Sequence, residues 1–220
     1  MSKPSSFRCL ITAGPTQEYI DPVRYISNPS SGKMGYAIAK AALNKGWTVD
    51  LVSGPVHLEE PKGAILYPVT SAEEMYHQVD ALFDVCDICI MTAAVSDFTA
   101  REVSEKKIKK ADADPELQLK LTRDILKTIC KRKSNQFVVG FAAETESLEM
   151  NAKEKLKNKG CDWIIANQVG LEGFGFSSDE NVITIFKKDG TSYEYGPTSK
   201  LALAEIIVQS ILDRLKNYNV

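Results

Sequence analysis

Two serines, a glycine and a lysine stand in succession near the end of the polar stretch DPVRYISNPSSGKMG, residues 21–35: Ser30, Ser31, Gly32 and Lys33. An amphipathic helical pattern begins at this lysine, and the first turn of a helix has N–H groups that favour an anion. The four residues therefore indicate a phosphate or carboxylate site. A simple helix N-cap formed by Ser30 or Ser31 explains them too, and on these residues alone it is the interpretation we favour.

Two further side chains of the same stretch change that balance. Arg24 offers a forked donor and Asn28 an amide, so together with Lys33 they make anion binding the better explanation. The stretch lacks the GxxxxGK[ST] spacing of a P-loop, and the chain lacks the GxGxxG of a dinucleotide site. The predicted anion site is therefore of another kind.

A second unusual stretch, AAVSDFTAREVSEKKIKKADAD, follows an apolar strand pattern at residues 87–94. Ala93 and Ala94 leave room for a ligand to approach the backbone, and Asp97 supplies an acceptor for a base amino group or a sugar hydroxyl. A run of lysines such as 106–110 is usually a solvated surface. In a long loop after a buried strand, it indicates a mobile flap, at about residues 98–114, that brings positive charge to a polyanion.

A pair of lysines, Lys155 and Lys159, is spaced four residues apart on a predicted helix. This spacing places both ammonium groups on one face, where they repel by about 0.2–0.5 kcal/mol unless an anion lies between them. Surface solvation is the alternative explanation. Cys86 and Cys89 have the spacing of half a zinc site, but no second pair exists, so we interpret them as core thiols and assign no metal ligands.

Strand and helix patterns alternate along most of the chain, which predicts an α/β fold: a Rossmann-like, mostly parallel sheet with helices on both faces. We expect a single domain over residues 1–220, with long active-site loops at the carboxyl ends of the strands. The strands are expected at 7–12, 47–52, 64–69, 87–94, 117–121, 137–141, 162–166 and 181–186. The helices are expected at 33–45, 71–83, 122–131, 146–159 and 198–215.

The composition excludes several classes of partner. The chain has 220 residues with 27 basic and 29 acidic side chains, so its net charge of -2 provides no field for nucleic acid or an anionic membrane. No apolar run approaches the roughly eighteen residues of a membrane span, and we expect a cytoplasmic protein. Five cysteines without a secretory pattern predict reduced thiols.

Seven motifs occur in an order that resembles one family, phosphopantothenoylcysteine synthetase, also called phosphopantothenate-cysteine ligase, of coenzyme A biosynthesis. The resemblance covers nearly the whole chain. The motifs are ITAGPT (11–16), DPVRYISN (21–28), SSGKMG (30–35), TAAVSDF (92–98), EKKIKK (105–110), VVGFAAET (138–145) and DWIIAN (162–167).

The resemblance implies a reaction in which 4'-phosphopantothenate attacks a nucleoside triphosphate, releases pyrophosphate and becomes an acyl-nucleotide that L-cysteine converts to an amide. It also implies Mg²⁺ and a homodimer. GFAAET (140–145) and the lysine pair favour CTP, as in bacterial members, over the ATP of the eukaryotic type. Because only about six residues precede the first predicted strand, we expect the synthetase alone, without FMN or decarboxylase activity.

The same resemblance assigns roles to individual residues. Asn28 matches the asparagine that holds the acyl-nucleotide, Arg24 lies in the same loop, and Lys107 matches the flap lysine that acts when the intermediate is converted; we predict these three as catalytic. Ala93 and Ala94, with Asn28, are predicted at the substrate. The predicted nucleotide contacts are Gly14, Ser31, Gly32, Lys33, Asp97, Lys107, Phe141, Lys155 and Lys159.

One segment departs from the family pattern, and two other functions remain open. In LTRDIL, Arg123 stands where relatives have proline, so contacts from 122–125 are uncertain on sequence grounds. A Rossmann NAD(P) oxidoreductase would explain the βαβ start and Gly14, although the glycine spacing is wrong and Asp50 lies inside the second strand. A non-catalytic subunit that binds a phosphorylated metabolite would retain every phosphate-handling feature.

Overall fold

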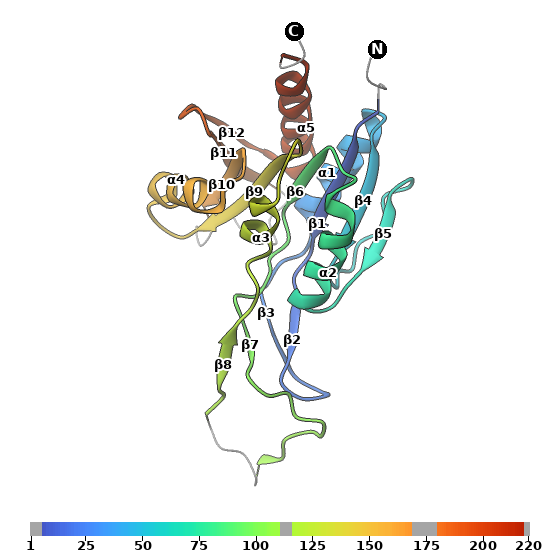
Figure 1. Ribbon diagram of the computed structural model, residues 1–220, viewed down its shortest axis with the longest axis vertical. Helices are drawn as coiled ribbons and strands as arrows, with labels where there is room; N and C mark the ends of the chain where they lie inside the picture. The colour runs from blue at the N-terminus through green and yellow to red at the C-terminus, as the bar shows by residue number, and fades with distance from the viewer. Residues whose placement is uncertain (1–5, 111–115, 169–179, 218–220) are drawn as a thin grey trace.

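The computed structural model describes residues 6–110, 116–168 and 180–217, and its centre is an eight-stranded sheet (Figure 1). The strand order is β12-β11-β10-β9-β6-β1-β4-β5. The pairs from β10 to β5 are parallel, whereas β11 and β12 are antiparallel additions at one edge. The strands are β1 (Arg8–Ala13), β4 (Thr48–Ser53), β5 (Ile65–Pro68), β6 (Ile88–Met91), β9 (Phe137–Glu144), β10 (Trp163–Gln168), β11 (Glu180–Lys187) and β12 (Ser192–Ser199).

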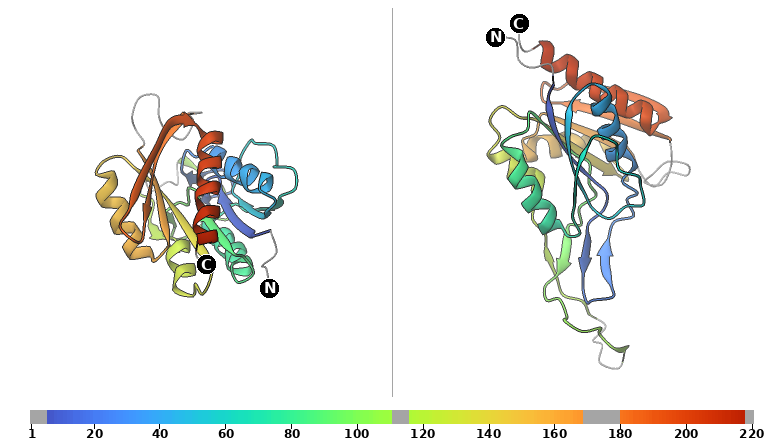
Figure 2. Two further views of the ribbon diagram at one scale, coloured as in Figure 1. Left: turned by 90° about the horizontal axis from the view of Figure 1, so that it is seen from above. Right: turned by 90° about the vertical axis from the view of Figure 1, so that its right-hand side faces the viewer.

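Helices cover both faces of this sheet (Figure 2). One core lies beneath α1 (Lys33–Asn44) and α5 (Lys200–Asn217). The second lies beneath α2 (Ala72–Phe83), α3 (Ile125–Lys131) and α4 (Leu148–Lys159). Successive residues of a strand point to opposite faces, so Ile11 packs in the first core and Leu10 in the second. The predicted α/β, Rossmann-like, mostly parallel fold is confirmed.

Local signals explain where helices begin and end. The Ser71–Glu74 capping box at the start of α2 is present as the sequence predicts. At α1 the alternative explanation, a serine cap, is wrong: the N-cap is Gly32, with φ of 75°, and no side chain caps the helix. Glycine adopts this left-handed backbone conformation without strain. Because glycine occupies the N-cap position, no serine hydroxyl is available there to cap the helix. Gly46, with φ of 77°, follows α1 and ends it as expected.

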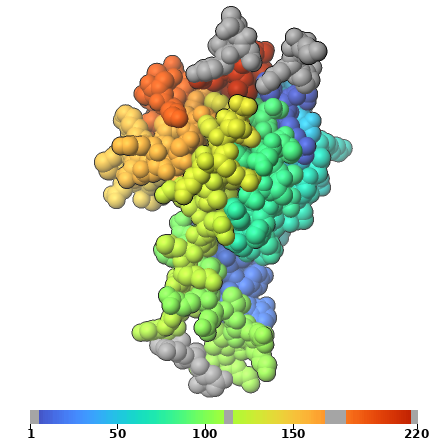
Figure 3. Space-filling view, in the orientation of Figure 1, coloured from blue at the N-terminus to red at the C-terminus, as the bar shows by residue number. Residues whose placement is uncertain are grey.

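Four short strands lie outside the central sheet. β2 (Gln17–Tyr19) pairs with β3 (Tyr25–Ser27), and β7 (Phe98–Ala100) pairs with β8 (Leu119–Leu121). We call these strands and residues 101–110 the arm, which extends as a narrow projection from the body (Figure 3). Within the predicted flap, residues 111–114 lie outside the described residues.

The arm corrects the sequence interpretation in two places. Residues 21–35 were expected as one loop, but 25–27 form β3 of a hairpin. The strand expected at 117–121 exists as β8, yet it pairs with β7 and is no part of the central sheet. These strands have three residues each, too few to show an apolar alternation. The exposed edge strand β12 escaped the sequence analysis because its residues are mostly solvent-accessible.

The cysteines confirm the core interpretation. All five thiols are free, and Cys86 and Cys89 are buried in the core beneath α2 and α3. Burial raises the pKa of the Cys86 thiol to about 12. Within the described part of the chain, no helix is both long enough and apolar enough to cross a membrane.

Candidate phosphate-binding active site

A cavity of about 590 Å³ opens where the loops after β1 and β6 meet the carboxyl ends of β9 and β10. The chain winds from β1 to β4 and β5 on one side, then crosses to β6 on the other side of β1. Loops that leave neighbouring strands in opposite directions open a crevice at such a point. The cavity therefore lies at the place where α/β sheets bind their ligands.

The first wall is the segment that leads into α1. Ser30, Ser31, Gly32 and Lys33 all line the cavity, so the start of the helix faces it. A Cβ atom on Gly32 would lie 2.7 Å from Val56 Cγ1, which is too close. The space at this position therefore requires glycine, as does the positive φ angle. Gly14, predicted as a nucleotide contact, does not line the cavity; its Cα lies behind Gly32, 3.5 Å from where that Cβ would be.

The amide of Asn28 joins this wall to the next. Its Nδ2 donates to the carbonyl oxygens of Ala94 at 3.2 Å and Val95 at 3.1 Å. The loops after β1 and β6 are thus held together across the cavity. Ala93 and Ala94 line the cavity beside Asn28, and their small side chains leave the backbone accessible from it.

The lysine pair forms the cationic wall. Lys155 and Lys159 both line the cavity from α4 and are half-buried. The ammonium group of Lys159 is bound by the carboxylate of Asp124, which also caps α3 by accepting the Lys127 N–H at 3.0 Å. Burial acts to raise the pKa of Asp124, but the bonds from Lys159 and Lys127 outweigh it, and the pKa lies below its usual range.

Lys155 has the opposite electrostatic environment. Burial lowers its pKa, and the nearby charge of Glu144 offsets only part of this effect. A half-buried ammonium group next to a second lysine gains from any anion that enters the cavity. Asp124 therefore compensates the charge of Lys159. The charge of Lys155 is only partly compensated, so an anion bound beside it would stabilise its ammonium group.

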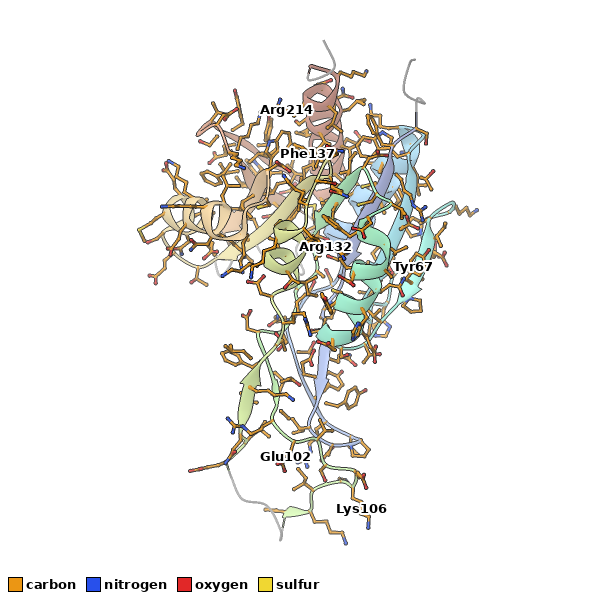
Figure 4. All side chains as sticks on the ribbon, viewed as in Figure 1. Tyr67, Glu102, Lys106, Arg132, Phe137 and Arg214 are labelled. Atoms are coloured by element: carbon orange, nitrogen blue, oxygen red, sulfur yellow. The ribbon has the colours of Figure 1, made fainter. Side chains whose placement is uncertain are left out.

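Most of the predicted site residues come together in this one cavity. Those that line it are Asn28, Ser31, Gly32, Lys33, Ala93, Ala94, Asp97, Phe141, Lys155 and Lys159. Arg24 and Lys107 do not. Arg24 donates to Asp21 and to the carbonyl of Ile108, and Lys107 follows Lys106 at the far end of the arm (Figure 4).

Two lining residues were missed by the sequence analysis, Asn181 and Lys200, while Arg123 and Asp124 line the cavity from the segment 122–125, whose contacts the sequence left uncertain. Asn167 also lines the cavity, near the end of the parallel strand β10, and the rule about carboxyl ends points to it. Asn181 lies at the start of the antiparallel strand β11 and Lys200 begins α5, so that rule does not reach them. Asn181 and Lys200 reach the cavity because β11 and β12 add to the sheet in the antiparallel direction. The sequence did not predict that direction.

Arg123 explains how the unusual segment 122–125 is held. Its guanidinium carbon lies 4.1 Å from the ring centroid of Tyr76, and Nη2 lies 3.4 Å from a carboxylate oxygen of Glu73. Both partners belong to α2. A proline at this position would fix the backbone directly, whereas Arg123 attaches the segment to the helix by its side chain.

Removing this attachment gives a test. We expect Arg123→Ala to weaken binding of a phosphorylated ligand by about three- to tenfold, since an exposed ion pair and a cation–π contact together contribute about 1 kcal/mol. Titration with inorganic triphosphate measures the effect.

Arg132→Ala is the matched control. Arg132 also contacts α2, over Phe83 at 5.5 Å and beside Asp80 at 3.2 Å, but it does not line the cavity. Equal affinity losses in the two variants would contradict a specific role for Arg123 in the site.

The donor set favours an anion over a protein-held metal ion. Among the described residues, no group of three or more His, Cys, Asp and Glu side chains is arranged to hold a metal. Serines, a helix start and lysines face the cavity instead, with the carboxylates of Asp97 and Asp124 beside them.

A doubly wound sheet with these groups at its switch point defines the class: an α/β protein with a candidate anion-binding cavity at the carboxyl ends of its strands. Residues 5–215 match the family model of the DNA/pantothenate metabolism flavoprotein C-terminal domain, and the chain belongs to this family. The resemblance inferred from the seven motifs is confirmed at the level of the family.

Individual relatives agree with this assignment. The coenzyme A biosynthesis bifunctional protein CoaBC of Bacillus subtilis is 50% identical over 203 residues, which cover 92% of this chain and 50% of that protein. The crystal structure of the C-terminal domain of a CoaBC protein is 40% identical with a TM-score of 0.83, and the match covers 97% of this chain and 99% of that one. The chain thus spans about half the length of the CoaBC relatives it matches.

A third comparison bears on the fold alone. A Cab2 mutant in complex with phosphopantothenate-cysteine has a TM-score of 0.77 at 16% identity, covering 97% of this chain and 88% of that one. The similarity of backbone at such low identity shows that the architecture is shared.

Proposed function

We propose that this chain is a phosphopantothenate-cysteine ligase that uses CTP. The observation that carries the proposal is the cavity itself: groups suited to phosphate, carboxylate and nucleotide meet there in a chain that matches the C-terminal domain of CoaBC along its length. CoaBC is a bifunctional protein of coenzyme A biosynthesis, and the Cab2 mutant is seen in complex with phosphopantothenate-cysteine.

The chemistry explains why such a site is needed. A carboxylate at neutral pH is a poor acylating agent, because oxide would have to leave. Attack of the 4'-phosphopantothenate carboxylate on the α-phosphorus of CTP forms a mixed anhydride and breaks the bond to pyrophosphate. The cysteine amine then attacks the acyl carbon, loses a proton and expels CMP. Both steps develop charge on phosphate or acyl oxygens, so fixed positive groups stabilise them.

The proposed roles follow the walls of the cavity. The N-terminus of α1 and Lys33 would receive phosphate oxygens, and the lysines of α4 would compensate the remaining charge. Binding at Lys155 is favoured most, because an anion restores the stabilisation that its ammonium group loses by burial. Asn28 would hold the acyl-nucleotide where the two loops are joined.

Mg²⁺ is proposed to enter with the nucleotide. Mg²⁺ in such sites usually binds phosphate oxygens and one or two carboxylates, and retains water molecules. Asp124 is occupied by Lys159 and by its capping bond, so the ion is proposed to be held mainly by phosphate oxygens and water. When bound, the ion would neutralise part of the triphosphate charge.

The nucleotide is proposed to be CTP because of two features of the cavity. Phe141 lines it from within the GFAAET motif, and the lysine pair stands on the following helix. Asp97 provides an acceptor for an amino group or a sugar hydroxyl.

Pyrophosphate release tests the function. With 4'-phosphopantothenate and Mg²⁺, we expect release with CTP, less with ATP, and further turnover only after L-cysteine is added. Asn28→Asp is expected to lower turnover by at least about a hundredfold, because a carboxylate would face the carbonyls of Ala94 and Val95 and the incoming phosphates.

Pyrophosphate release, together with a thermal-shift series with CTP and NADPH, separates the ligase from its alternatives. A chain that releases no pyrophosphate with either nucleotide is no ligase. A non-catalytic phosphometabolite-binding subunit would bind CTP without turnover, and an oxidoreductase would be stabilised against heat by NADPH instead of CTP.

A homodimer is proposed to complete the site. Lys107 is outside the cavity in a single chain, and the arm that carries it exposes large apolar side chains, as a pairing surface does. These exposed residues of the arm's strands are Tyr19, Tyr25, Phe98, Leu119 and Leu121. Pairing of two arms would bury them and would bring Lys107 of one copy to the cavity of the other.

Mixed dimers test this arrangement. We expect Lys107→Gln to bind CTP and release pyrophosphate but to accumulate acyl-nucleotide. Mixing it with Asn28→Asp should restore about a quarter of wild-type activity, because half of a random mixture is heterodimer and each heterodimer has one intact site. No restoration after subunit exchange would mean that Lys107 acts within its own chain.

A further inference from the structure

Asp21 is a fully buried carboxylate in the turn between β2 and β3. Its Oδ1 accepts the N–H groups of Val23 at 2.8 Å and Arg24 at 2.9 Å. These two bonds are local and shape the turn. Its Oδ2 accepts the guanidinium of Arg24, with Nε at 3.0 Å, and the N–H of Ile108 at 3.2 Å. The second oxygen thus binds a residue 87 positions along the chain.

The Asp21–Arg24 pair holds the backbone of Ile108 at both of its polar groups. While Asp21 accepts the Ile108 N–H, Nη2 of Arg24 donates to the Ile108 carbonyl at 3.1 Å. A turn that only needed a local cap would leave out these two contacts. The pair therefore does more than stabilise the hairpin: it attaches a second part of the arm to it.

The attached stretch is residues 104–108, which we call the flap segment. At its other end the Ser104 N–H donates to the Ile20 carbonyl at 3.0 Å, and the Ser104 hydroxyl donates to the Lys106 carbonyl at 2.7 Å. Lys107 lies between these attachments, next to Ile108. Figure 4 shows the neighbouring Lys106 at the end of the arm, pointing away from the body.

We propose that Asp21 is a positioning residue: with Arg24 it latches the flap segment to the β2–β3 hairpin and so fixes the direction in which Lys107 is presented to the acyl-nucleotide. The inference rests on the proposed ligase. A lysine has a long, flexible side chain, so the precision of its ammonium group depends on how firmly its backbone is held. Arg24 takes part in the latch through its bond to the Ile108 carbonyl, in addition to the catalytic role predicted for it.

The latch is built to persist at neutral pH. Bonding by Arg24, and by the N–H groups of Val23, Ile108 and Arg24, lowers the pKa of Asp21 against the effect of desolvation. A carboxyl group with a lowered pKa stays ionised even at pH values below its ordinary pKa, and it loses these bonds only as the pH falls through the lowered value. Neutral solution therefore keeps the latch closed.

Limited proteolysis tests the latch without reference to activity. Trypsin cleaves after lysine, and the flap segment contains Lys106 and Lys107. We expect Asp21→Asn, in which an amide replaces the ionised acceptor, to raise the rate of cleavage there by about tenfold, since a less protected segment opens more often. The amide proton of Ile108 should also exchange faster with solvent.

The matched control is Asp189→Asn. Asp189 likewise accepts the Thr191 N–H and hydroxyl and has a lowered pKa, but it lies in the turn between β11 and β12. Arg24→Gln is the second test variant. It removes the bond to the Ile108 carbonyl but leaves Asp21 its local N–H partners, so the turn should remain folded. It therefore tests the latch even if Asp21→Asn does not fold. Cleavage of both test variants at the wild-type rate would overturn the latch.

Single-turnover kinetics test what the latch is for. Asp21→Asn should form acyl-nucleotide and release pyrophosphate within about twofold of the wild-type rate, yet form the amide about tenfold more slowly. Equal slowing of both steps, or unchanged amide formation, would overturn the positioning role. Failure of the wild-type chain to release pyrophosphate overturns the ligase together with this role, whereas unchanged proteolysis overturns the latch alone.

Discussion

The ammonium group of Lys155 is half-buried at the wall of the cavity, one helical turn from Lys159. Its charge is disfavoured by burial, and this is why its pKa is lowered. Asp124 compensates Lys159, so the remaining demand for negative charge is concentrated at Lys155 and at the start of α1. A chain with a net charge of -2 has no general attraction for anions, and the affinity of this site therefore has to come from the local arrangement.

The central sheet positions the binding groups, and the arm carries Lys107. The central sheet supplies a rigid edge at which loops after β1, β6 and β9 meet, and the amide of Asn28 ties the first two. The arm carries Lys107 away from that edge, where Asp21 holds the adjacent backbone. Binding groups are thus built into the body, while the lysine assigned to the later step stands on the arm, outside the cavity of its own chain (Figure 4).

The sequence predicted the body much better than the arm, for physical reasons. Buried strands such as ICIM at 88–91 show long apolar runs, and the Ser71–Glu74 box marks a helix start unambiguously. β2, β3 and β7 are short and project into solvent, so no burial pattern records them. Lys155 was predicted from its spacing, but neither the Asp124–Lys159 bond nor the attachment of Arg24 to Ile108 could be read from residues so far apart in sequence.

In the proposed reaction the acid is activated through its own oxygen, by attack on a nucleotide bound in this cavity. The most direct measurement uses 4'-phosphopantothenate whose carboxylate carries a heavy oxygen isotope, followed by mass analysis of the products after cysteine is added. Transfer of one labelled oxygen to CMP is the predicted result, because the bond from that oxygen to the α-phosphorus survives when the amide forms. Label found in released phosphate, or in no nucleotide product, would contradict the account.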